Sequence, residues 1–594
     1  MSSEESAESP VSAAATPTDA SVLGVAFRRD RIAALVVAIA VVGVALRLLA
    51  LGARPLHWDE ARVGYWALRA LDTGAYQYRP VAGGPLVHLL ARASITVLGP
   101  TEFAARLPIA LLGGALPVTA LLFRDRLRDG ETVLFALVLG VQPLVLYYSR
   151  FLRGDVPLAV FALAFLGFAL RAWDRESRRD AYAAAFMLPL AASASGFAAG
   201  YLLCWIAAWV LVVEQRPVAT GRGAAVRAAL RTLRRRLAGS VTPAARASLL
   251  AVVTTVFLFA PRKGPGVRAG LYDPGDVPVA IYEGTLGALW RFVGVRIVHR
   301  APEGTHAILP FVSDAIGLLI AVALPVFVAG VTVTLLVRYA RMQRPLVEGV
   351  GYWGLLAVVV FPTITEVSAP WVLVHAVVPL SLPATVGLAA LLRRGVAAAS
   401  QSHRSAVDVA TVVAVVLVVL AVGAQTGAAA ASGVYGPADR SNQYAQYAQP
   451  SDDLEHIETA VRVAADDGSA PAVAYVGPAF SVPDEGSLRS PPVSDAFGAR
   501  LPLPWYVESA GGTATSAVNA SAFAARYEGA RAPPVVVADP AHRSSLSATL
   551  GDEYEATTSR LGLWNRDVVV FVDRRVAARG NTTSIRPETG LSEK

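Results

Sequence analysis

The chain has 594 residues and a mean hydropathy of +0.48, with 54% hydrophobic and only 16% charged residues. Soluble domains carry roughly 25% charged residues, so this composition and repeated apolar runs of about 20 residues indicate a polytopic membrane protein. The single cysteine, Cys204, excludes an intramolecular disulfide and a cysteine-built zinc site. The net charge of +8 comes from arginines in short loops, so no nucleic-acid partner is expected.

The N-terminal segment 1–27 is rich in Ser, Ala, Glu and Thr and shows no periodicity, which predicts a disordered tail. A basic cluster, Arg28-Arg29-Asp30-Arg31, then precedes the first apolar run, 32–51. We interpret this run as an uncleaved membrane helix with its basic flank in the cytoplasm. The N-terminus is therefore expected inside, and the segment after the run outside.

Two amphipathic segments follow in the predicted first external loop, 52–103. The segment 86–98 has only 13 residues and carries His88 and Arg92, so it is too short to span the membrane. The segment 60–71 mixes charged and apolar residues at helical spacing. We expect both to form helices lying in the membrane plane.

The remaining apolar runs place every strongly basic short loop on one side of the membrane, which supports the predicted topology. The long arginine-rich loop 214–247 is then cytoplasmic, and the Gly- and Pro-rich loop 262–309 is external. The whole predicted membrane domain covers 28–429. The eleven predicted spans are 32–51, 104–123, 131–148, 157–173, 181–195, 197–213, 248–261, 310–337, 348–365, 371–392 and 408–428.

The last segment, 430–594, changes in composition and holds 20 Asp and Glu against 14 Lys and Arg. Apolar stretches alternate with helical patterns, which predicts a soluble α/β domain on the external side. The patterns Asn519-Ala520-Ser521 and Asn581-Thr582-Thr583 are glycosylation acceptors and suit that side. The predicted strands are 472–476, 535–538 and 568–572, and the predicted helices are 452–465 and 519–527.

The first candidate site is Asp59-Glu60, which follows the first span between His57 and Arg62. One interpretation is a catalytic base or metal ligand that takes a proton from an acceptor hydroxyl. The alternative is that Asp59 caps the helix 60–71, where carboxylates are favoured. Both interpretations are open at this point.

A second external cluster runs from Tyr147 to Pro157. Its Arg150 and Arg153 carry planar fork-shaped donors that suit phosphate, and Asp155 adds a third carboxylate. Interfacial anchoring by tyrosines and arginines is the alternative. External arginines run against the positive-inside bias, which favours a functional role.

Two further places carry candidate ligand-binding side chains. Arg79 precedes the chain-breaking Gly83-Gly84-Pro85 and is a candidate phosphate contact. Trp371 and His375 begin the tenth predicted span, after Glu366. A histidine at a membrane surface is a functional candidate, although a histidine hydrogen-bonded between helices is an equal alternative.

All these carboxylates and arginines fall on the predicted external face. Such a site suits a lipid-linked anionic donor, with phosphate on arginine at the headgroup level and Asp59 activating an acceptor.

The order of a first span, an Asp-Glu pair, two in-plane helices and Arg-x-x-Arg-x-Asp-x-Pro resembles the GT-C glycosyltransferases. Within them it is similar to the protein O-mannosyltransferase and aminoarabinose-transferase-like group, and to a haloarchaeal family described as flippase-activity-associated. The segments that carry the resemblance are 57–62, 78–85, 148–157, 370–379 and 501–506.

The resemblance implies a GT-C fold and a dolichyl-phosphate-linked sugar donor on the external face, with inversion at the anomeric carbon. It implies that Asp59 is the catalytic or metal-binding acid, with Glu60 beside it. Asp155 matches the acid of a later external loop, and Arg79 stands where relatives place a basic phosphate contact, commonly a lysine.

Three functions follow as hypotheses. The first is a glycosyltransferase that moves the sugar to an external glycan or protein acceptor. The second is a non-catalytic, flippase-associated protein that promotes translocation of the lipid-linked sugar. The third is a surface-assembly scaffold acting through 430–594. A divalent metal, Mg²⁺ or Mn²⁺, shared by Asp59 and Asp155 is an open alternative for the first.

Overall fold

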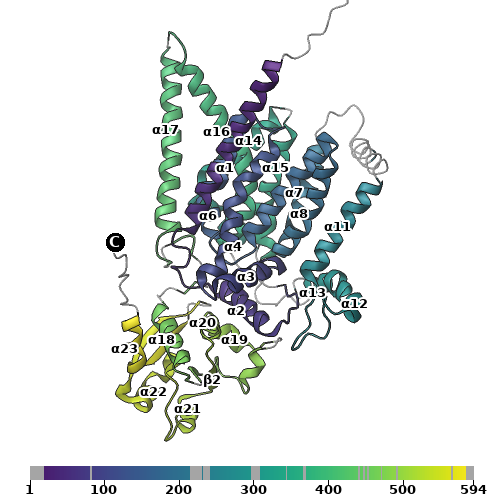
Figure 1. Cartoon of the computed structure of the whole chain (residues 1–594). Coiled ribbons are helices and arrows are strands. Elements are labelled where there is room, and N and C mark those ends of the chain that lie inside the picture. Colours follow the sequence, from purple (N-terminus) through teal and green to yellow (C-terminus); the bar gives the residue numbers. More distant parts are fainter. Residues whose placement is uncertain are drawn as a thin grey trace, which may run out of the picture.

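The computed structural model describes residues 19–80, 83–214, 231, 241–295, 308–340, 342, 344–365, 369–403, 405–438, 442–445, 449–450, 454–469, 471–489, 493–562 and 566–583. Long helices form a bundle, and a smaller domain with a β-sheet lies against one end of it (Figure 1). Helices α2 (Trp58–Thr73) and α3 (Pro85–Leu98) lie between these two parts. The segment 1–18, most of the predicted loop 214–247, and Glu366 lie outside the described residues.

Eight helical stretches of the described chain are long and apolar enough to cross a membrane. Several combine an α-helix with a short 3-10 or π segment. The stretches are Asp30–Leu48 within α1 (Asp19–Leu48), Glu102–Phe123 (α4, Glu102–Ala115, and η1, Leu116–Phe123), Asp155–Arg175 (α7), Val241–Phe259 (α11), Ile308–Tyr339 (α14), Pro345–Ile364 (α15), Pro370–Ala399 (η5, Pro370–Leu373, and α16, Val374–Ala399) and Ala406–Val434 (α17, Ala406–Ala429, and η6, Ala430–Val434).

The other three predicted spans correspond to shorter helices. Helices α8 (Arg178–Ala194) and α9 (Ala198–Glu214) have 17 residues each. The predicted span 131–148 is not one continuous helix, because it breaks at Gln142 into α5 (Asp129–Val141) and α6 (Pro143–Tyr148). Pro143 has no N–H to continue the hydrogen bonding of α5. The total of eleven spans stays a prediction.

Two other segments differ from their sequence interpretation. Helix α1 begins at Asp19, so 19–27 is helical rather than disordered, and the helix runs through the basic cluster 28–31 into the first apolar run. The loop 262–309 contains α12 (Val277–Tyr282), which follows the 3-10 turn Pro274–Asp276, and α13 (Ala288–Val293), which the π segment Glu283–Gly287 joins to α12.

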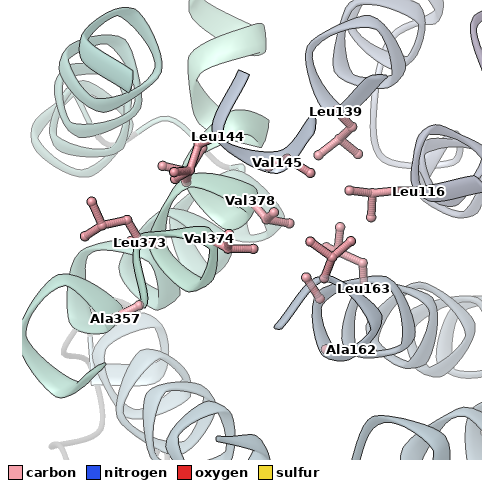
Figure 2. Packing of buried hydrophobic residues seen from close by; sticks show 14 of the residues in the cluster. Leu116, Leu139, Leu144, Val145, Ala162, Leu163, Ala357, Leu373, Val374 and Val378 are labelled. Carbon is pink, nitrogen blue, oxygen red and sulfur yellow. The ribbon is translucent and has the colours of Figure 1, made fainter. Parts of the chain in front are cut away.

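Helix α16 lies at the centre of the bundle. Of an apolar 18-residue stretch within Pro370–Ala399, 89% of the residues are buried inside the protein. Figure 2 shows Val374 and Val378 of α16 facing Val145 of α6 and Leu163 of α7. Helix α17 is the opposite case, because no residue of its apolar 18-residue stretch is buried against other parts of the protein. A helix that is apolar all round and unburied fits a lipid-facing position at the edge of the bundle.

The C-terminal domain contains a five-stranded mixed sheet in the order β2-β1-β3-β5-β4. Strand β1 (Val473–Val476) pairs in parallel with β2 (Ala514–Ala517) and β3 (Val535–Ala538), with Val473 opposite Ala514 and Val535. Strand β5 (Asp567–Asp573) pairs antiparallel with β3 and with β4 (Tyr554–Arg560). The helices of the domain are α18 (Glu455–Asp466), α19 (Asp495–Arg500), α20 (Leu503–Ser509), α21 (Ala520–Arg526), α22 (Arg543–Leu550) and α23 (Arg574–Thr583), with 3-10 turns η7 (Glu485–Arg489), η8 (Pro540–His542) and η9 (Gly551–Glu553).

The three predicted strands correspond to β1, β3 and β5, whereas β2 and β4 had no sequence signal. Both missed strands lie at edges of the sheet and contain small or polar residues, so they lack the apolar run of a central strand. Asn519 caps α21 by accepting a hydrogen bond from the Ala522 N–H at 2.8 Å.

The C-terminal domain is fastened to α2 by tight packing and hydrogen bonds. The ring of Trp505 lies so close to Gly64 that a Cβ there would be 2.6 Å from Cε3. The Trp58 indole N–H donates to the Gly498 carbonyl at 2.8 Å, and Arg69 pairs with Glu508 at 2.9 Å. The helix that carries Asp59 is therefore clamped between the bundle and the C-terminal domain (Figure 1).

Candidate functional site at the junction of bundle and C-terminal domain

Asp59 is the second residue of α2, but it is not the helix cap. His57 occupies the cap position, and its Nδ1 accepts a hydrogen bond from the Asp59 N–H at 3.1 Å. The Asp59 carboxylate is thus free to point away from the backbone, and its side chain is 15% exposed. This geometry assigns the N-cap to His57, while Asp59 in the first turn still lies near the positive end of the helix dipole.

Glu60 has a structural position that does not suit its predicted catalytic role. Both of its oxygens accept hydrogen bonds from Arg106 at 2.8 Å, and Arg54 adds a contact of 3.2 Å. Backbone N–H groups of His57 and Leu152 donate to it at 3.0 and 2.8 Å. Burial raises the pKa of this carboxyl, but Arg106 and Arg54 outweigh that effect and hold the pKa at about 2. A carboxylate so fully engaged and buried has no lone pair available for substrate.

Arg150 also holds a structural position, and its role as a phosphate ligand stays a prediction. Its guanidinium donates to the carbonyls of Leu49, Ala50 and Val434 at 2.8 to 2.9 Å and lies 4.8 Å from the Tyr435 ring centroid. Burial lowers the pKa of Arg150 to about 10. These contacts tie the ends of two membrane helices together through Nη1 and Nη2, whereas Nε is buried and has no hydrogen-bond partner among the described residues.

Arg153 is the connecting residue of the site. Its Nη1 pairs with the Asp59 carboxylate, and its Nε donates to Asp155 at 2.9 Å. The guanidinium also lies 4.0 Å from the centroid of the Trp371 ring. Although burial opposes the charged form, Asp155 and Asp59 together raise the pKa of Arg153. Two carboxylates from different segments are therefore held together by one arginine.

The cluster continues inward from Asp155. The Asp155 carboxylate lies 3.3 Å from Nε2 of His375, and Nδ1 of the same ring lies 2.9 Å from the Tyr201 hydroxyl. His375 has no exposed surface. His57 lies beside these residues, because its ring centroid is 6.2 Å from that of Trp371. Burial lowers the pKa of His57 to about 4, so the ring is neutral near pH 7. We call Asp59, Arg153, Asp155 and His375 the Asp59 cluster.

Arg62 and Arg79 do not join the Asp59 cluster. Arg62 lies one turn beyond Asp59 on α2, with its guanidinium 5.4 Å from the Trp58 ring centroid. Arg79 lies 5.6 Å from the Trp66 ring centroid. Burial and the neighbouring charges of Arg62 and Arg291 lower the pKa of Arg79 to about 10. These residues belong to a second, basic region beside the cluster.

Arg79 lines an open cleft of about 820 Å³, with adjoining solvent included, between α2, α3 and the C-terminal domain. Gly83 and Gly84 are among the residues that line the cleft. A Cβ on Gly84 would be 2.2 Å from the Ser193 carbonyl oxygen, and one on Gly154 would be 1.9 Å from that of Ala194. The end of α8 therefore packs against both Gly84, in the cleft lining, and Gly154, which follows Arg153. The four residues of the Asp59 cluster are not among those that line the cleft.

The predicted metal site does not match the donor arrangement. Asp59 and Asp155 both point at Arg153, so a guanidinium occupies the place where a cation shared by them would lie. Within the described part of the chain, no group of three or more His, Cys, Asp or Glu side chains is placed to hold a metal ion. We derive no step through a metal, and the metal stays a prediction.

Sequence reasoning missed three residues around this site. Arg106 lies inside a predicted span. A charged residue inside a membrane span usually has a specific partner, so the sequence already marked Arg106 as a residue of interest. Arg54, whose guanidinium lies 3.5 Å from the Phe151 ring centroid, and the buried Tyr201 carry no local pattern that marks them. Their roles come from contacts with residues far away in the chain.

Comparisons with known proteins agree with this architecture. Residues 80–231 match the family model described as dolichyl-phosphate-mannose-protein mannosyltransferase. The crystal structure of ArnT from Cupriavidus metallidurans in the apo state superimposes with a TM-score of 0.52 at 16% identity, covering 91% of this chain and 98% of that chain. The fold is that of the GT-C glycosyltransferases. The predicted fold class is thereby confirmed, as is the resemblance on which it rested.

The GT-C fold also relates the protein to the Archaeoglobus fulgidus oligosaccharyltransferase tethered with an acceptor peptide containing the NVT sequon. That structure has a TM-score of 0.50 at 12% identity and covers 88% of this chain and 72% of its own. Residues 454–573 match the Agl23 flippase-associated protein C-terminal domain. No curated protein matches this chain in sequence.

Proposed function

We propose that the protein uses a dolichyl-phosphate-linked sugar at the external membrane surface for cell-surface glycosylation, with Asp59 as the catalytic acid/base. The observation that carries this proposal is the exposure of Asp59. Its side chain is 15% exposed, whereas those of Arg153 and Asp155 are 6% and 3% exposed. Asp59 is the carboxylate of the cluster that an acceptor can reach.

In the proposed reaction, Asp59 takes the proton of an acceptor hydroxyl while the hydroxyl oxygen attacks the anomeric carbon. The bond from that carbon to the phosphate oxygen breaks, and the phosphate leaves with the electron pair. Arg79 binds the phosphate, as the family resemblance implies. Arg153 orients the Asp59 carboxylate, and His375 acts through Asp155 to position Arg153.

A flippase-associated role is the second candidate. The match of 454–573 to the Agl23 flippase-associated C-terminal domain favours it. In this alternative, the same face binds the lipid-linked sugar and promotes its translocation without transfer. The predicted topology, with the N-terminus in the cytoplasm and the C-terminal domain outside, applies to both candidates.

The test uses purified protein in liposomes that contain radiolabelled dolichyl-phosphate mannose. Sugar release or transfer is compared for the wild type, Asp59→Asn, and the control Asp72→Asn, whose side chain is 61% exposed on the same helix. Loss of general-base catalysis lowers turnover by about 10²- to 10⁴-fold, so Asp59→Asn alone is expected to fall. No turnover in any variant, with the donor still bound, would instead support the flippase-associated role.

A further inference from the structure

The cleft between α2, α3 and the C-terminal domain contains Arg489 and His88, which the proposed transfer step does not use, beside Arg79, which that step assigns to the donor phosphate. We infer that this cleft binds the negatively charged group of an acidic sugar, and that the C-terminal domain completes it through Arg489. This inference rests on the proposed function, because it assigns a ligand class to the same face of the protein. The charged group is a carboxylate or a phosphate.

The charged side chains that line the cleft are all basic. Its lining includes Arg69, Arg79 and Arg489 but no Asp or Glu. Arg69 has a partner, because it pairs with Glu508 at 2.9 Å. No carboxylate of the described residues forms an ion pair with Arg79 or Arg489. Arg79 is half-buried beside the charges of Arg62 and Arg291, which is unfavourable until an anion joins it, whereas Arg489 is exposed and reaches the cleft from the C-terminal domain.

Buried polar atoms in the lining also lack partners. Nε2 of His88 and Nε of Arg69 are buried and have no hydrogen-bond partner among the described residues. Burial and the charges of Arg92 and Arg262 lower the pKa of His88 to about 3, so its ring is neutral near pH 7. A neutral imidazole can donate to or accept from a sugar hydroxyl. Buried polar atoms without partners in a cleft indicate a ligand or ordered solvent.

The cleft has an apolar side that suits a sugar ring. Trp66 and Tyr76 line it, and Arg79 lies over the Trp66 ring. Aromatic faces offer flat apolar surface next to polar groups, which matches the apolar face and hydroxyl edge of a pyranose. Arginines supply paired donors for a carboxylate or phosphate. The lining combines arginines, a neutral imidazole and aromatic side chains, which suits the charged group and the hydroxyls of an acidic sugar.

The C-terminal domain fixes Arg489 at the cleft. The preceding carbonyl, that of Leu488, accepts a hydrogen bond from the Tyr65 hydroxyl of α2 at 3.4 Å. The Arg69–Glu508 pair lies across the same junction. Removing the domain would leave the cleft without one of its arginines. Gly84 of the lining and Gly154, which follows Arg153, both pack against backbone carbonyls at the end of α8.

The test measures binding to the full-length protein in nanodiscs at low ionic strength. The probes are a glucuronate-containing tetrasaccharide, neutral chitotetraose and dolichyl phosphate. The variants are wild type, Arg489→Gln and the control Arg574→Gln, an exposed arginine of the same domain that does not line the cleft. Loss of a charged hydrogen bond weakens binding by about tenfold. We expect that loss in Arg489→Gln alone, and no effect on chitotetraose.

The probes separate the two sources of the anion. A tenfold loss for the tetrasaccharide assigns the anion to a glycan, and the same loss for dolichyl phosphate assigns it to the lipid donor. Unchanged binding of both probes in Arg489→Gln would overturn the inference, as would equal affinity of the wild type for the acidic and neutral saccharides. Asp59→Asn is expected to bind normally. A failure of catalysis is thereby distinguished from a failure of this site.

Discussion

Glu60 and Arg106 form a doubly hydrogen-bonded ion pair in which neither side chain has any exposed surface. The pair joins the first turn of α2 to α4, and Leu152 donates its N–H to the same carboxylate. The Asp59 cluster is therefore built beside a buried ion pair whose hydrogen bonds are all made within the protein. Asp59 is next to Glu60 in sequence, yet the two carboxylates have different surroundings.

Glu60→Gln is expected to destabilise the protein strongly. Removing one partner of a buried ion pair leaves the other charge uncompensated, which costs about 3–5 kcal/mol. Thermal unfolding in detergent, followed by tryptophan fluorescence, measures the effect. Glu508→Gln is the comparison, because its pair with Arg69 is partly exposed and worth much less. Equal melting temperatures for the two variants would contradict the structural role of Glu60.

Arg153→Lys is expected to lower activity at least tenfold while the protein stays folded. Arg153 donates from separate nitrogens to Asp59 and Asp155 and stacks on Trp371, and a single ammonium cannot reproduce that geometry. Turnover and melting temperature are measured together. Arg175→Lys, an exposed arginine near the other end of α7, serves as the control. Wild-type turnover in Arg153→Lys would show that the bridge does not position Asp59.

Chelation is expected to leave donor binding and turnover unchanged. The reason is that Arg153 already compensates the charge between Asp59 and Asp155. The measurement compares protein treated with EDTA and protein supplied with Mg²⁺ or Mn²⁺ in the liposome assay. Loss of activity with EDTA, restored by one of these ions, would mean that Arg153 moves away and the predicted metal site forms.

Gly154→Ala is expected to impair both stability and activity. A Cβ at this position would lie 1.9 Å from the Ala194 carbonyl oxygen, so α7 and α8 would have to separate just where Arg153 and Asp155 are placed. Gly130→Ala is the matched control, because its added Cβ meets nothing within 4 Å. Size-exclusion profiles after heating measure stability. Identical behaviour of the two variants would show that this contact is not a constraint.

Much of the architecture follows from local pattern. Apolar runs predicted the membrane helices, and the in-plane segments at 60–71 and 86–98 match α2 and α3. Central strands such as Val535–Ala538 were predicted because four consecutive apolar residues form a buried run. Edge strands such as Tyr554–Arg560 were not predicted, since this strand pairs through its backbone and exposes polar side chains.

The sequence by itself determined that the protein crosses the membrane, that it carries a sheet domain at its C-terminal end, and that Asp59, Arg153 and Asp155 belong to one face. Length, hydropathy and the spacing of charges are local properties, so they are visible in the chain. Only the tertiary structure decided which carboxylate is available. Asp59 and Glu60 are adjacent, and their different roles depend on Arg106 and Arg153, which lie 46 and 94 residues away along the chain. Such partners are chosen by packing between helices, which no local pattern encodes.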